Sequence, residues 1–157
     1  MGERDEIALY YEQLVRWVDL VVGCLEGLSE EEANARPIET GNSLVIIATH
    51  LIGNLSQNLA VLGGPPYPRD RDAEFRATAS PGAVIARWRA LRPTIEEVLF
   101  ALPEGALAQT YGHPQLGDRS GRQLIVGAIT HAAVHAGEAE LTRDLVRARR
   151  LDTATAI

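Results

Sequence analysis

A long helical stripe near the C-terminus constrains the fold of this chain more than any other feature. Its members recur at alternating steps of four and three residues, the spacing that keeps side chains on one face of an α-helix. They are Leu124, Ala128, His131, His135, Glu138, Thr142 and Leu145. Because leucines flank the stripe, we expect it to face a hydrophobic core. Its centre nevertheless carries two imidazoles and a carboxylate, which are costly to bury unless they are paired or bound to a metal ion.

Helical periodicity also covers three earlier parts of the chain, and no segment alternates in the way that a half-buried strand does. The predicted helices span residues 5–28, 44–62, 81–102 and 120–148. Pro93 lies inside the third helix, where proline removes a backbone hydrogen bond, so we expect a kink or a break there. The stretch between the third and fourth helices is expected to be a loop.

The connection between the second and third helices, residues 63–80, has no sustained periodicity. It holds three prolines and then the charged run Arg69–Phe75. A connection of this length is unusual in a compact helical domain, and it would let the third helix run parallel to the second. We therefore predict an all-α fold, a four-helix bundle with up–down–down–up topology, and a single domain covering residues 1–157.

A third imidazole joins the pair on the last helix if the second and fourth helices are antiparallel neighbours. From the rise per residue, His50 then stands at roughly 20 Å on the scale that places His131 and His135 at roughly 16–22 Å. The three rings would meet, and three neutral imidazoles suit a divalent metal ion. Two other interpretations stay open: the histidines are hydrogen-bonded core residues, or the polar row marks a helix-to-helix dimer seam.

The arrangement resembles the DinB/YfiT-like superfamily. The resemblance rests on His50, on the H-x-x-x-H of His131 and His135 followed by Ala-Gly, and on the long crossover. Residues 50–55 and 71–75 are also similar to an uncharacterised bacterial subgroup. The resemblance implies a four-helix bundle that binds a divalent metal through these three histidines, with nickel or zinc expected before iron or manganese.

The resemblance also implies three kinds of function. The first is a metal-dependent thiol S-transferase that uses a low-molecular-weight thiol. The second is a metal-dependent hydrolase of amide-type substrates, and the third is a metal-binding or stress-response bundle without turnover. Three imidazoles leave coordination positions open, as catalytic sites do, so that a water molecule or a thiol at the metal would have a lowered pKa.

Two residues near the predicted ligands are candidates for a catalytic role. Glu138 stands where the superfamily often has glutamine, and its carboxylate could be a fourth ligand, an orienting group for His135 or a proton acceptor. Asn54 lies one turn after His50 and could bind substrate or a ligand, although a cap or a core-edge amide is an equal alternative.

Several other polar residues are expected to lie outside the site. Asp72 and Glu74 could close over its mouth, but a solvated charged loop stabilised by Arg69 and Arg71 is the favoured interpretation. His113, beside a proline in a loop, is expected to be exposed.

The charge and composition of the chain limit the kinds of partner that we expect it to bind. The net charge is −6 and all fifteen basic residues are arginine, without a basic stripe, which argues against nucleic acid. The sequence contains no run of eighteen apolar residues, so we expect no membrane span. The charged N-terminus is unlike a signal peptide, and the cytoplasm is the expected location. We expect a small-molecule substrate, including a low-molecular-weight thiol, and a homodimer.

Overall fold

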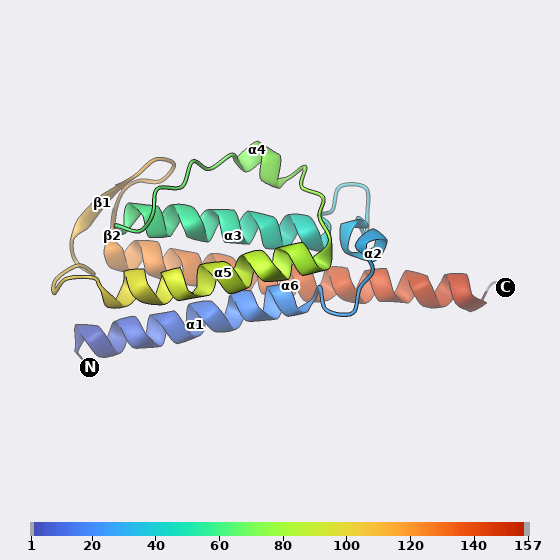
Figure 1. The fold of residues 1–157 in the computed structure, drawn as a ribbon, viewed down its shortest axis with the longest axis horizontal. Helices are drawn as coiled ribbons and strands as arrows, with labels where there is room; N and C mark the ends of the chain where they lie inside the picture. Colours follow the sequence, from blue (N-terminus) through green and yellow to red (C-terminus); the bar gives the residue numbers. More distant parts are fainter. Residues whose placement is uncertain (1, 156–157) are drawn as a thin grey trace.

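The structure, a computed structural model, describes residues 2–155, which form a mostly helical bundle (Figure 1). The long helices are α1 (Glu3–Gly23), α3 (Leu44–Val61), α5 (Pro81–Phe100) and α6 (Gly121–Thr155). Two short helices, α2 (Glu30–Asn34) and α4 (Arg71–Glu74), lie in the connections. The expectation of an all-α fold therefore holds in its general form, and α6 continues beyond Ala148, where we expected it to end.

Long-range contacts fix the relative directions of the helices beside the histidines. Glu6 in the first turns of α1 pairs with Arg122 at the start of α6, so these two helices run the same way. Asn42, just before α3, reaches Glu138 far along α6, whereas His50 lies beside His131 earlier in α6. These contacts make α3 antiparallel to α6. Figure 1 shows the connection from α3 to α5 returning along the length of the bundle through α4.

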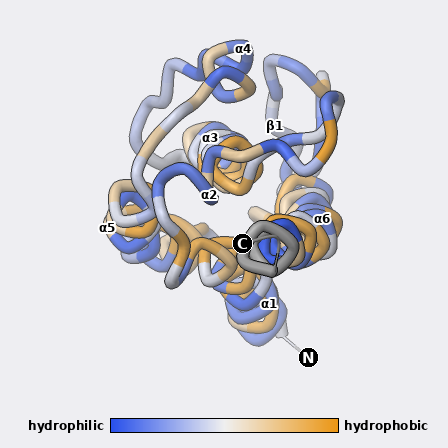
Figure 2. Tube along the Cα trace, turned by 90° about the vertical axis from the view of Figure 1, so that its right-hand side faces the viewer, coloured by the Kyte–Doolittle hydropathy of each residue, from blue (hydrophilic) through white to orange (hydrophobic). Residues whose placement is uncertain are grey.

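Helix α3 is the central element of the bundle. Seen along the bundle in Figure 2, it lies between α5 and α6, with α1 on one side and α4 on the other. Its length and apolar composition would suffice to cross a membrane, but 72% of the 18-residue window Leu44–Val61 is buried inside the structure. That burial is the pattern of a core helix in a globular domain.

The buried face of α6 differs from the predicted stripe. Its most buried positions are small residues, including Ala132, Ala136 and Ala139, which let the α6 backbone approach its neighbours closely. Leu145, expected to face the core, is 40% exposed. Leu124, Ala128 and Thr142 of the predicted stripe are buried as expected, whereas the part with His131, His135 and Glu138 is half-buried.

A short β-hairpin replaces the loop that was expected before α6. Strand β1 (Thr110–His113) pairs antiparallel with β2 (Gly117–Ser120), with Thr110 opposite Ser120 and His113 opposite Gly117. Four-residue strands offer too few alternations to produce a recognisable pattern in the sequence. Gly117 has a φ of +69°, a conformation that glycine adopts without strain, and it closes the turn.

Helix α5 runs without interruption through Pro93, so the expected break is not observed. Pro93 lies on the exposed side of the helix, where water can reach the carbonyl that has lost its backbone partner. Ser80 caps the helix by accepting a hydrogen bond from the backbone N–H of Ala83.

Candidate metal centre

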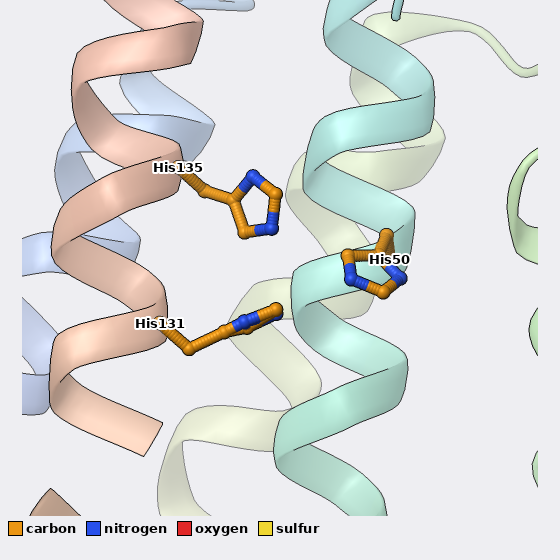
Figure 3. A group of neighbouring side chains, drawn as sticks. All are labelled: His50, His131 and His135. Carbon is orange, nitrogen blue, oxygen red and sulfur yellow. The ribbon is translucent and has the colours of Figure 1, made fainter. Parts of the chain in front are cut away.

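Helices α3 and α6 bring three imidazoles together. In Figure 3 the rings of His50, His131 and His135 turn towards one another, the first from α3 and the other two from α6. Their centroids lie 5.1, 5.2 and 4.5 Å apart for the pairs 50–131, 50–135 and 131–135. One ligand atom from each ring lies within 4.8 Å of the others, so the three histidines can hold a metal ion.

A buried carboxylate fixes the orientation of His50. Nδ1 of His50 lies 2.9 Å from Oε2 of Glu74, which can only accept a hydrogen bond, and 3.3 Å from Nη2 of Arg69, which can only donate one. The shorter contact with the carboxylate favours a proton on Nδ1, which leaves the lone pair on Nε2. Glu74 is 5% exposed and pairs with Arg69 through two hydrogen bonds of 2.7 and 2.8 Å. The expectation that Glu74 belongs to a solvated loop is wrong, because the crossover folds its carboxylate onto α3.

A glycine provides the space for this carboxylate. A Cβ atom at Gly53, one turn after His50, would lie 2.0 Å from Oε1 of Glu74. Glycine inside a helix is destabilising by about 1 kcal/mol relative to alanine, so its presence indicates a requirement for close approach. Gly53 is thus the sequence signal that could have revealed the contact between the crossover and α3.

The second ring has a carboxylate of its own. Nδ1 of His135 lies 2.7 Å from Oε2 of Glu138, three residues later on α6, which again leaves Nε2 with a free lone pair. The other oxygen of Glu138 accepts a hydrogen bond of 3.0 Å from the amide of Asn42. Glu138 therefore contacts His135 in the geometry that an orienting group would adopt.

His131 completes the cluster without such a partner. Its Nε2 atom is buried and has no hydrogen-bond partner among the described residues. Burial and the neighbouring rings of His135 and His50 lower the pKa of His131 to about 4, so the ring is neutral near pH 7. Burial likewise lowers the pKa of His50, although Glu74 opposes the shift. An orphaned nitrogen in a buried, neutral imidazole is what a metal ligand would present.

The ligand atoms lie somewhat too far apart for direct coordination of one ion. Zinc–nitrogen bonds of about 2.0–2.1 Å at tetrahedral angles place the ligand atoms of one ion about 3.4 Å apart. Because the ligand atoms here lie within 4.8 Å of one another, the rings would have to approach by up to about 1.4 Å on binding an ion. A carboxylate on the far nitrogen of two rings is also the usual second layer of a histidine metal site.

The structure gives different surroundings to the other residues considered in the sequence. The side-chain oxygen of Asn54 accepts a hydrogen bond of 3.1 Å from Asn58, and no described interaction links it to the three imidazoles. His113 is 4% exposed, contrary to expectation, because its Nδ1 accepts hydrogen bonds from the backbone N–H groups of Gln115 and Leu116. Asp72 is exposed on α4, as expected.

An open groove of about 840 Å³ runs along α6 beside the cluster. His131 and His135 line it together with the apolar side chains of Val126 and Val134. Val134 is 66% exposed, although it stands one residue before His135. A small molecule could therefore approach the imidazoles from the α6 side against an apolar wall.

Fold and site together define a helical-bundle protein with a cluster of three histidines, between two of its helices, that could hold a metal ion. The family model described as the DinB superfamily matches residues 13–139, and the chain belongs to that superfamily. The fold is similar to the crystal structure of a conserved protein from Enterococcus faecalis, with a TM-score of 0.73 and 19% sequence identity. That match covers 94% of this chain and 99% of the other, and it shows the fold alone. No curated protein matches the chain.

Proposed function

We propose that this protein is a divalent-metal-dependent thiol S-transferase that uses a low-molecular-weight thiol. Its metal ligands are His50, His131 and His135. The observation that carries the proposal is the buried, unpartnered Nε2 of His131 beside two rings whose lone pairs are left free by carboxylates. An orphaned nitrogen alone does not exclude a core histidine, because Nε2 of His113 is also buried without a partner among the described residues. His131 differs from His113 in that two further imidazoles converge on it.

The chain's own groups would prepare the site for such chemistry. A divalent ion supplies Lewis acidity, which lowers the pKa of a thiol or of a water molecule at the site. Glu74 and Glu138 hold the protons of His50 and His135 on Nδ1, so that both rings stay in the tautomer that binds a metal. Val126 and Val134 give the open groove beside the site an apolar lining, which favours a soft, weakly hydrated reactant.

Glu138 is proposed as a positioning residue and, once substrate is bound, as the nearest candidate proton acceptor. Both of its oxygens already accept hydrogen bonds, from His135 and Asn42, which favours orientation over direct ligation. Asn54 has no contact of this kind, and a role in substrate binding would require its amide to leave Asn58.

Nickel and zinc are the proposed metals, with iron and manganese as alternatives. Imidazole ligands suit all four to different degrees, and divalent affinity generally rises from manganese through iron to nickel. We also propose a cytoplasmic homodimer that acts on a small molecule, without nucleic acid or membrane partners. The antiparallel contacts of α3 with α6 support an up–down–down–up topology for the bundle.

The proposal is tested with metal-loaded protein and two kinds of substrate. Thiol-dependent consumption of a small electrophile, absent in His131→Ala, is the result expected for sulfur transfer. Hydrolysis of an amide substrate in the absence of thiol would replace it with the hydrolase alternative. Stoichiometric metal without either reaction would leave a metal-binding or stress-response protein, and the absence of bound metal would contradict the proposal.

A further inference from the structure

The crossover between α3 and α5 contacts the metal centre through one ligand only. Glu74, in the last position of α4, accepts the hydrogen bond of His50, and the ring of the next residue, Phe75, lies 4.7 Å from the His50 ring. The guanidinium carbon of Arg71 lies 4.9 Å from the centroid of the Phe75 ring. Residues of the crossover thus pack against His50.

An arginine from the same crossover locks the carboxylate in place. The Arg69 side chain is only 2% exposed and binds Glu74 through both Nε and Nη2. Its Nη1 atom donates to Gln57 on α3 over 3.2 Å and to Gln115 in the hairpin over 3.4 Å. A paired, buried arginine with four acceptor oxygens is held more firmly than a solvated one, because few of its donors remain for water.

The carboxylate also depends on a space that only glycine leaves. A side chain at Gly53 would meet Oε1 of Glu74 at 2.0 Å, so alanine there would displace Glu74 from His50 without removing any polar group. The contact between Glu74 and His50 is therefore built into α3 as well as into the crossover.

We propose that Arg69 and Glu74 form a buried clamp that positions His50 for the metal, so that metal binding and the docking of the crossover stabilise each other. The inference rests on the proposed function, since it assumes that His50 is a ligand. Glu74 is a positioning residue that acts through His50. Thermodynamic linkage makes this effect reciprocal. If the contact with Glu74 raises the metal affinity of the site, bound metal stabilises the docked crossover by the same free energy.

The reciprocity distinguishes this clamp from a crossover that is only a structural connection. A structural role would change the stability of the bundle without changing the tautomer of His50 or the response of the crossover to metal. The clamp predicts both changes. It also predicts that both changes depend on where the carboxylate lies and not on the net charge of residues 69–75.

The experiment compares the full chain with Glu74→Gln, Gly53→Ala and the matched control Asp72→Asn. Asp72 is exposed on the same short helix, so its neutralisation makes the same change of charge without touching His50. Cobalt(II) and zinc affinities are measured by competition titration. Histidine ¹⁵N spectra of the metal-free protein report the His50 tautomer, and hydrogen exchange of residues 69–75 is measured with and without zinc.

Glu74→Gln and Gly53→Ala should each lower metal affinity by about 10- to 100-fold, whereas Asp72→Asn should stay within about twofold of wild type. In the metal-free wild type, His50 should carry its proton on Nδ1, and this preference should fall in both variants. Zinc should slow hydrogen exchange in residues 69–75 of the wild type and of Asp72→Asn only. Gly53→Ala keeps the test open if Glu74→Gln fails to fold.

Two failures have different meanings. If the wild-type chain binds no ion, the proposed function is overturned and the clamp with it. If the wild type binds an ion but both variants bind it equally well, with an unchanged His50 tautomer, the clamp alone is overturned and the metal centre stands.

Discussion

Glu138 accepts a hydrogen bond from Nδ1 of His135 over 2.7 Å, within a single turn of α6. This pair is local in sequence, whereas Glu74 reaches His50 from a different segment that lies 24 residues further along the chain. The histidine cluster therefore combines one ring whose orientation is set inside its own helix with one whose orientation depends on tertiary structure. The two carboxylates can be tested separately.

Replacing Glu138 with alanine should weaken metal binding by about 10- to 100-fold, because His135 would lose the acceptor that fixes its tautomer. Glu138→Gln should lose less, since the amide oxygen can still accept the Nδ1 proton, whereas in Glu74→Gln the two Arg69 donors compete for the one amide oxygen. Competition titration against a chromophoric chelator measures both. Glu140→Gln, which neutralises an exposed charge on the same helix, is the control. Equal affinities in Glu138→Ala and wild type would remove Glu138 from the site.

The unpartnered nitrogen of His131 should cost stability when no metal is present. A buried polar group without a hydrogen bond typically costs about 1–3 kcal/mol, so His131→Leu should raise the unfolding free energy of the metal-free protein by about 1 kcal/mol. Urea unfolding in the presence of a chelator measures the change. A loss of stability in this variant would show that His131 has a hydrogen-bond partner in solution.

The cap of α3 should affect stability without affecting the ligands directly. Ser43 accepts a hydrogen bond of 3.2 Å from the backbone N–H of Ile46 at the start of the helix that carries His50. Ser43→Ala should destabilise the protein by about 1 kcal/mol, measured by urea unfolding, and should retain one ion per chain. Loss of metal in a folded Ser43→Ala protein would mean that the cap also determines the position of His50 relative to His131 and His135.

Acid should weaken the contact between α1 and α6. The Arg122 guanidinium and the Tyr10 hydroxyl lower the pKa of Glu6 from 4.5 to about 2. Because the pKa is lower in the folded state, the stabilisation from Glu6 is complete above its unfolded value and is lost as the pH falls towards about 2. Glu6→Gln should therefore flatten the decline of the melting temperature over this range, and Glu12→Gln, exposed on the same helix, should not. Parallel curves for wild type and Glu6→Gln would contradict the assignment.

Much of the fold and the ligand set could be predicted because both depend on helical periodicity. The stripe through His131 and His135, and the height of His50 on α3, follow from a fixed rise per residue. The same periodicity misjudged Leu145, since only packing decides which of two neighbouring rows enters the core. On α6 a row of alanines is buried beside the stripe, whose members Leu124, Ala128 and Thr142 are buried as predicted.

The parts that could not be predicted depend on contacts between distant segments. Glu74 lies in a charged run that resembles a solvated loop, and nothing in that run shows that Gly53 leaves space for its carboxylate. His113 is buried because two backbone N–H groups of its own turn point at Nδ1, a geometry that a single histidine beside a proline does not reveal. Tertiary approach thus decided the position of Glu74, whereas the local geometry of a turn holds the His113 ring.

The most direct test of the account is the metal content of purified protein after reconstitution and desalting, measured by elemental analysis. The wild type and His113→Ala, which removes a histidine outside the cluster, should each retain one divalent ion per chain. His50→Ala, His131→Ala and His135→Ala should retain almost none while keeping a helical circular dichroism spectrum. A wild-type chain without metal, or single-histidine variants that hold as much as the wild type, would contradict a metal centre formed by these three imidazoles.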